Sequence, residues 1–273
     1  MGRSEPKIGF CFLVYGSVEY ADVWRAYFRS QNCGVYVHSK RPAAAKASLN
    51  GIPGVEVLEH PTDTSWGDVS LVEATARLFR SAFAAGCDVS CLCSDTMLPV
   101  VPFRVLQMRL RAGSLFQVQS SPSSDEFEAR EGNRAMISAK LNQGQLENAT
   151  KANMFFAMSR DDFAVLDAAP EFRAFETIWV GAPDEYYWIN MMALRGRDAR
   201  AGRFVYCAED HAGVTAAELH DLDARLLERL ARLRFLFVRK VRRIVAVPGY
   251  LAMIGVAADV RTTSSQITGH VWG

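Results

Sequence analysis

Apolar and polar positions alternate along the first half of the chain in blocks that predict strands and helices in turn. Compact apolar runs bounded by polar residues or glycine predict buried strands at 7–16, 34–38, 55–58, 88–93 and 115–118. Apolar residues spaced by three and four predict helices at 20–30, 70–85 and 103–111. This alternation favours an α/β fold with a mostly parallel central sheet and flanking helices.

The second half is read in the same way. It predicts a strand at 154–158 and helices at 161–169 and 183–194, with proline at the first position of the last one. Leucines that step by three or four predict a long basic amphipathic helix, or two helices, over 218–243. The polar stretch 120–131 predicts a surface loop. With no repeat and no linker, the chain 1–273 is predicted to be a single domain.

Composition and charge exclude several classes of protein. The 273 residues are 49% hydrophobic and 22% charged with a net charge of +1, so no overall field attracts nucleic acid or membrane. The six cysteines form no C-x-x-C pair, which leaves a zinc ribbon unsupported. The uncharged run 244–258 is shorter than the about 20 residues of a membrane span. The start of the chain has no signal-peptide pattern, so we expect a cytoplasmic or soluble protein without a membrane span.

Polar residues follow two of the predicted strands. These residues are His38, Ser39 and Lys40 after one strand, and Ser94 and Asp95 after another. Parallel sheets bind ligands beyond the carboxyl ends of their strands, although Asp95 could also be a simple turn former. A second acid two residues after Asp95 would suit a divalent metal, but Met97 stands there, and one carboxylate is a poor site. An Asp-x-Asp match at 221–223 falls inside the predicted long helix.

Two charged groups could carry chemistry. Residues 225–243 hold eight basic side chains against Glu228, and most of this run is typical of a solvated face. Arg239 and Lys240 differ because apolar neighbours bring them close to the core, where fixed cations could stabilise a leaving diphosphate. Asp184 and Glu185 suit the first turn of a helix, yet a carboxylate there could also act as a general base.

Seven segments, in this order, resemble one known family. They are FLVYGS at 12–17, VYVHSKRP at 35–42, SWGDVSLVEA at 65–74, CLCSDTMLP at 91–99, KANMFFAMSR at 151–160, APDEYYW at 182–188 and FLFVRK at 235–240. Together they are similar to the core-2/I-branching β-1,6-N-acetylglucosaminyltransferase family, which includes peptide O-xylosyltransferases. The resemblance runs from about residue 8 to residue 241.

The resemblance implies a GT-A fold and a glycosyltransferase that inverts the anomeric carbon without a metal cofactor. It implies a UDP-sugar donor, with N-acetylglucosamine or xylose as the sugar, and a glycan or glycoprotein acceptor. Glu185 corresponds to the catalytic base. The implied donor-binding residues are His38, Ser39, Lys40, Trp66, Gly67, Ser94, Asp95, Arg239 and Lys240, and the implied acceptor-binding residues are Lys151, Asp184 and Phe155, where relatives often have tryptophan.

Other functions are weighed against this one. An inactive relative that binds a sugar nucleotide or glycan is the alternative, and an intact Glu185 with Arg239 and Lys240 argues against it. A nucleic-acid-binding module is disfavoured by the near-zero net charge. A Rossmann oxidoreductase is excluded because no G-x-G-x-x-G follows the first strand. The oligomeric state stays open.

Overall fold

The computed structural model describes residues 5–118, 149–168, 182–209 and 216–256. Its helices are α1 (Ala21–Phe28), α2 (Pro42–Ser48), α3 (Ser70–Ala84), α4 (Phe103–Leu110), α6 (Arg160–Asp167), α8 (Tyr187–Leu194), α9 (Ala224–Arg232) and α10 (Val247–Met253), with a 3-10 turn η1 (Pro183–Glu185). Its strands are β1 (Ile8–Val14), β2 (Cys33–Ser39), β3 (Val55–Val57), β4 (Val89–Cys93), β5 (Leu98–Pro99), β6 (Leu115–Phe116), β7 (Ala157–Ser159), β8 (Arg200–Ala201), β9 (Val205–Tyr206), β10 (Ala208–Glu209), β11 (Ala216–Ala217), β12 (Leu219–Leu222), β13 (Phe237–Val238) and β14 (Val241–Ile244).

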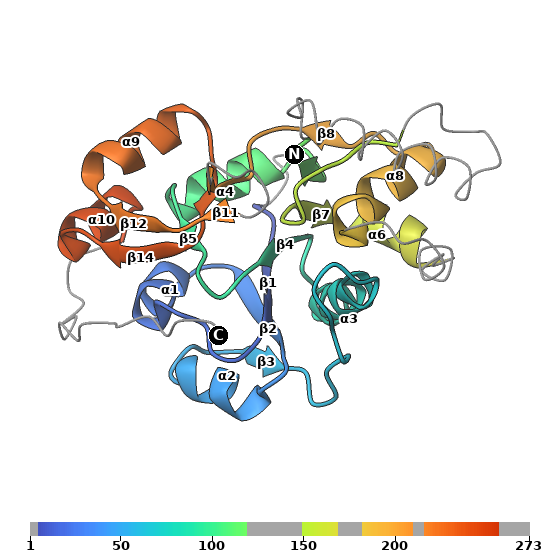
Figure 1. Ribbon diagram of the computed structural model, residues 1–273, viewed down its shortest axis with the longest axis horizontal. Coiled ribbons are helices and arrows are strands. Elements are labelled where there is room, and N and C mark those ends of the chain that lie inside the picture. The colour runs from blue at the N-terminus through green and yellow to red at the C-terminus, as the bar shows by residue number, and fades with distance from the viewer. Residues whose placement is uncertain (1–4, 119–148, 169–181, 210–215, 257–273) are drawn as a thin grey trace.

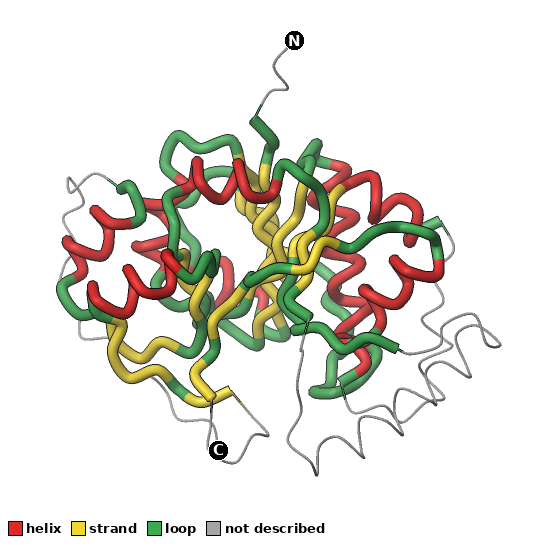
Figure 2. The backbone as a smooth tube through the Cα atoms, turned by 90° about the horizontal axis from the view of Figure 1, so that it is seen from above, coloured by secondary structure: helices red, strands yellow, loops and turns green. Residues whose placement is uncertain are grey.

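A seven-stranded sheet forms the centre, in the order β3-β2-β1-β4-β7-β6-β8. Its pairs are parallel except that β7 runs antiparallel to both β4 and β6. Helices lie on both sides of the sheet (Figures 1 and 2). The predicted α/β fold of GT-A type with a mostly parallel central sheet is therefore confirmed.

The alternation of residues along β1 explains the two helix layers. The rings of Phe10 and Phe12 lie 5.8 and 5.2 Å from that of Trp24, so they face α1. Gly9 points the other way, where a Cβ would come within 3.0 Å of Ala82 in α3. Large residues on one face and a glycine on the other thus let α3 pack directly against the strand.

A second, three-stranded sheet has the order β5-β13-β9. Val238 of β13 is in register with Leu98 of β5 and with Tyr206 of β9. The segment 236–238 is also linked to Phe204, since Leu236 N and Phe237 N both donate hydrogen bonds to the Phe204 carbonyl. Three segments far apart in the sequence therefore meet at one place.

The predicted long helix over 218–243 is wrong. The segment instead forms β12, α9, β13 and β14 in turn. Asp223 begins α9 by accepting a hydrogen bond from Leu226 N at 2.7 Å, and Arg234 follows the helix in the left-handed region at φ 68°. These two residues interrupt the helix, so the leucine spacing continued across boundaries that periodicity alone does not show.

The charges of this segment pair across strands. Strand β12 runs parallel to β14 with Asp221 in register with Arg243, and their side chains form a 2.7 Å ion pair. Arg242 pairs with Glu218 in the same way. The two acids of the Asp-x-Asp match therefore form a salt bridge and a helix cap, respectively.

Smaller differences concern the second half. The predicted helix 183–194 is divided into η1 and α8 at Tyr186, and the predicted strand 154–158 is shifted to β7. The described part of 244–258 contains α10, in which Tyr250 and Leu251 are buried. The loop predicted at 120–131 lies outside the described residues. Helix α2 was not predicted.

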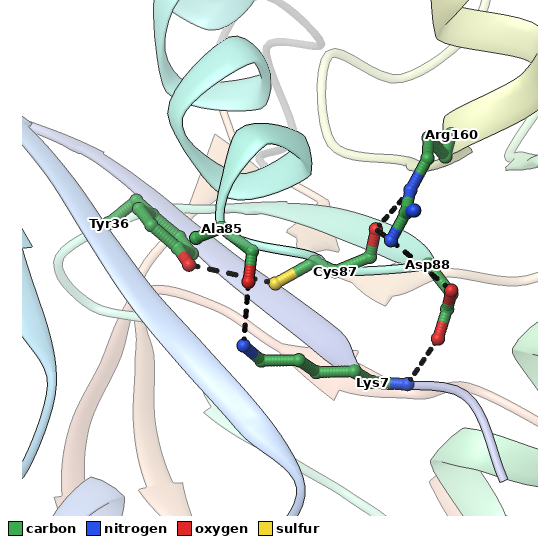
Figure 3. A network of polar contacts seen from close by, with 6 residues as sticks. All are labelled: Lys7, Tyr36, Ala85, Cys87, Asp88 and Arg160. Atoms are coloured by element: carbon green, nitrogen blue, oxygen red, sulfur yellow. Dashed lines mark hydrogen bonds and ion pairs between the residues drawn. The ribbon is translucent and has the colours of Figure 1, made fainter.

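A polar network closes the edge of the sheet where β1 and β4 begin (Figure 3). Lys7 Nζ donates to the Ala85 carbonyl at 2.8 Å, and Lys7 N donates to Asp88 Oδ2 at 2.8 Å. Arg160 Nε reaches the Cys87 carbonyl at 2.8 Å. The network links α3, β4 and α6 at the end of the sheet where the strands begin. The strand ends that carry His38 and Asp95 lie at the opposite end.

Asp162 is a buried carboxylate close to this edge. Burial would raise its pKa, but hydrogen bonds from Ser114 (2.5 Å) and Ser159 (2.7 Å) and the ion pair with Arg197 outweigh burial and lower the pKa. Its ionised form therefore stabilises the fold above the ordinary aspartate pKa of about 4, and the stabilisation is lost as the pH falls further.

We predict that Asp162→Asn lowers the free energy of unfolding by about 2–3 kcal/mol at pH 7, because it leaves Arg197 without its buried partner. Urea denaturation should show this deficit shrinking as the pH is lowered below about 4. Asp161→Asn is the matched control, since Asp161 is exposed. If the loss of unfolding free energy in Asp162→Asn were as large below about pH 4 as at pH 7, this account would be contradicted.

Candidate functional site

The three-stranded sheet gathers the polar residues of the candidate site. Arg239 and Lys240 follow β13, Cys207 follows β9, and Ser94 and Asp95 precede β5. Arg239 N donates a hydrogen bond to the Tyr206 carbonyl at 3.0 Å, which fixes the backbone of the basic pair. Residues more than 140 positions apart are therefore held at one end of a short sheet.

The guanidinium of Arg239 lies over an aromatic ring. Its Cζ is 4.7 Å from the centroid of the Phe155 ring, within the range of a cation–π interaction. Its buried Nε has no hydrogen-bond partner among the described residues. Within that part of the chain, no carboxylate lies within 4 Å of Arg239 as an ion-pair partner. The cation is thus held in place without being neutralised.

Cys207 experiences the charges on both sides of the site. Burial raises the pKa of its thiol, and Arg239 and Lys240 lower it, while the negative charge of Glu185 raises it. The Cys207 thiol is therefore close enough to the predicted base and the predicted pair of cations for all three charges to act on its pKa, although about 50 residues separate base and cations in the chain.

Glu185 lies at the end of η1. This turn begins after Ala182, whose left-handed backbone has φ 68°. The Glu185 carbonyl accepts a hydrogen bond from Ala152 N at 2.9 Å, and Glu185 Oε2 forms a 2.8 Å ion pair with Lys151 Nζ. Both side chains are largely but not fully buried. Two contacts thus fix the carboxylate against the 151–155 segment.

The neighbouring Asp184 is more deeply buried, at 7% exposure. Burial, and then the charge of Glu185, raises its pKa to about 7. Its Oδ1 has no hydrogen-bond partner among the described residues. This carboxyl is buried, which is a poor place for direct contact with an acceptor.

Trp66 and Gly67 lie beside the same turn. Trp66 is 85% exposed, the largest exposed fraction of any big apolar side chain in the described ranges. Gly67 has φ +70°, and a Cβ on it would come within 3.8 Å of Ala182 N. The loop that the sequence assigned to the donor therefore adjoins the turn that carries Glu185.

The polar side chains at the carboxyl end of β2 contact neighbouring loops. His38 is buried, and its Nε2 accepts a hydrogen bond from Thr62 N at 2.8 Å. Burial, with the nearby charge of Arg77, lowers its pKa to about 4, so the ring is neutral near pH 7. Ser39 Oγ donates to the Gly16 carbonyl at 2.9 Å, and Lys40 forms a 3.4 Å ion pair with Asp63. These three side chains already hold loops together, so their contact with a nucleotide stays a prediction.

Ser94 and Asp95 lie at the end of β4, two strands from β2 and about 10 Å from its end. Ser94 Oγ is buried and without a partner in the described residues. Burial raises the pKa of Asp95, and the charge of Arg239 opposes this. Asp95 is therefore close enough to Arg239 for the two charges to interact.

The structure brings together Glu185, Lys151, Phe155, Asp95, Arg239 and Lys240, all of which the sequence singled out. It adds Cys207, which no sequence pattern indicated because a lone cysteine after a two-residue strand carries no motif. In the described ranges, no group of three or more His, Cys, Asp or Glu side chains is placed to hold a metal ion.

Comparison with known families decides the assignment. The model of the core-2/I-branching enzyme family matches residues 8–200, well over half of the chain. The chain belongs to the core-2/I-branching enzyme family. Membership implies a glycosyltransferase that uses a nucleotide-sugar donor and a glycan acceptor. No individual curated protein matches the chain.

The family match ends at residue 200, so it includes Glu185 and Lys151 but stops before Arg239 and Lys240. The guanidinium of Arg239 contacts the matched region at the ring of Phe155. In the described part of this family member, no helix is long and apolar enough to cross a membrane.

The backbone at Lys240 offers a direct test of this geometry. Lys240 has φ 58°, in the left-handed region that costs about 1 kcal/mol for a residue with a Cβ. We predict that Lys240→Gly is about 1 kcal/mol more stable to denaturant than Lys240→Ala, since both remove the ammonium and only glycine removes the strain.

The same pair of changes at Arg242, in β14, is the control. There the order should reverse, because glycine weakens a strand. If Lys240→Ala were as stable as Lys240→Gly, the left-handed conformation would be contradicted.

Proposed function

We propose that this family member transfers N-acetylglucosamine or xylose from a UDP-sugar to a hydroxyl of a glycan or glycoprotein, with inversion and without a metal ion. The observation that carries the proposal is that one short segment contacts both groups: Lys151 pairs with Glu185 at 2.8 Å, and the guanidinium of Arg239 lies over the ring of Phe155. An inverting transfer needs a base and a stabiliser of the leaving group in one site, on opposite faces of the sugar.

Glu185 is the proposed general base. It takes the proton from the acceptor hydroxyl, and that oxygen attacks the anomeric carbon from the face opposite to the diphosphate. The ion pair of Lys151 with Glu185 Oε2 supports this role, because it orients the carboxylate. Glu185 Oε1 is the oxygen that we expect to accept the proton.

Arg239 and Lys240 are the proposed counter-charges of the departing diphosphate. The bond between the anomeric carbon and the diphosphate oxygen breaks, and both bonding electrons leave with UDP. Two adjacent cations can stabilise the negative charge that develops there, with arginine as a bidentate fork and lysine as a point charge. The absence of an ion-pair partner for Arg239 within the described ranges supports this assignment.

The remaining residues have proposed roles around these two groups. His38, Ser39 and Lys40 shape the nucleotide end through the loops that they hold, and Ser94 and Asp95 border the diphosphate. Trp66 and Gly67 lie in the loop beside the sugar. Lys151 and Asp184 act on the acceptor side, where Asp184 supports Glu185 from behind.

Glu185→Gln should lower turnover by about 10²–10⁴-fold while UDP still binds, because the variant keeps the shape of the side chain but cannot take a proton. The assay follows UDP release and glycoside products by mass spectrometry, with simple glycosides as acceptors and UDP-N-acetylglucosamine or UDP-xylose as donor. Calorimetry measures the binding of UDP.

The control is Glu228→Gln, which removes a surface carboxylate that pairs with Arg232 and should leave turnover unchanged. Retained turnover in Glu185→Gln would exclude Glu185 as the base. A wild-type protein that binds UDP-sugars without turnover would instead favour the alternative of an inactive, sugar-nucleotide-binding relative.

A further inference from the structure

We propose that Phe155 is a positioning residue that holds the guanidinium of Arg239 where the diphosphate leaves, and so acts on the donor side of the site. This rests on the proposed function, in which Arg239 binds the diphosphate. It differs from the role that the family resemblance suggests for this position, namely a wall that meets the acceptor or the donor sugar directly.

The burial of the ring argues against contact with an acceptor. Phe155 is only 2% exposed, and the guanidinium of Arg239 lies over its face at 4.7 Å from the ring centroid. The backbone of Phe155 is itself fixed, because its N–H donates to Asn153 Oδ1 at 3.0 Å. A sugar cannot stack on a face that is already covered, but a cation held on that face is placed with precision.

Arg239 depends on such support. Arginine has many rotamers, and an ion pair with a carboxylate would be the usual way to restrict them. Among the described residues, Arg239 has no carboxylate within ion-pair distance, and Asp95 acts on it only through its field. An aromatic face restricts the side chain without neutralising it, so the positive charge stays available for an anion.

The next residue shows that the orientation of Phe155 is specific. The ring of Phe156 has different neighbours, since it stacks on Phe116 with centroids 4.7 Å apart and an interplanar angle of 11°. It also packs edge-on against Phe79. Two adjacent phenylalanines therefore serve different purposes: one supports the core, and the other supports the cation.

The test compares the binding of UDP and of uridine to the full chain by calorimetry. Phe155→Leu should weaken UDP binding by about 3- to 30-fold and leave uridine binding unchanged, because only the diphosphate contact depends on Arg239. Phe155→Tyr keeps an aromatic face and should bind UDP like the wild type. In the Arg239→Ala background, Phe155→Leu should cause no further loss, since the two residues act through one contact.

Phe156→Leu is the matched control. It removes the same atoms from a neighbouring buried ring, and it should lower thermal stability without changing the ratio of UDP to uridine affinity. The inference is overturned if Phe155→Leu leaves UDP affinity intact while Arg239→Ala weakens it, and the proposed function then stands. Equal losses of UDP and uridine would also overturn it, by showing general damage to the site. A wild-type protein that binds no UDP would overturn both.

Discussion

The pairing of β13 with β9 and β5 is the constraint on which the candidate site depends. Each of these strands has only two residues, yet their register sets Val238 beside Tyr206 and Leu98. The next residues along the chain are Arg239 after β13 and Cys207 after β9. If this register slipped by one residue, every side chain would turn to the other face, and Arg239 would leave the ring of Phe155.

Charge is distributed unequally around this sheet. Most basic residues of the 225–243 segment are paired or solvated, as Arg243 is with Asp221 and Arg232 with Glu228. Arg239 is different because its neighbours are an aromatic ring, a thiol and a carboxyl that acts at a distance. A cation that is held but not neutralised can interact with a phosphate at full strength, whereas a salt-bridged one must first lose its partner.

The sequence predicted the central sheet well because its strands are continuous apolar runs and its first helices have clear spacing. It failed over 218–243, where leucines at helical spacing continue through β12, and where a cap at Asp223 and a left-handed Arg234 interrupt the helix. Such breaks depend on pairing with β14, which lies more than 20 residues away in register. Local periodicity carries no information about that pairing.

The sequence also predicted the candidate site only in part, because it does not show which segments meet in space. The family motifs identified Glu185 and the basic pair as separate segments, but only the fold shows that they meet. Phe155 was expected to face the acceptor, since an aromatic residue in a motif does not reveal what covers it. Cys207 carries no sequence signal, because only the fold brings its thiol near the charges of Glu185, Arg239 and Lys240.

The most direct test of glycosyl transfer without a metal is the consumption of a panel of UDP-sugars by the wild-type protein, with and without EDTA, followed by chromatography and mass spectrometry. The account predicts that one UDP-sugar is hydrolysed slowly at the same rate in both conditions. A requirement for a divalent ion would contradict the role given to Arg239 and Lys240, and consumption of no UDP-sugar would contradict the transferase itself.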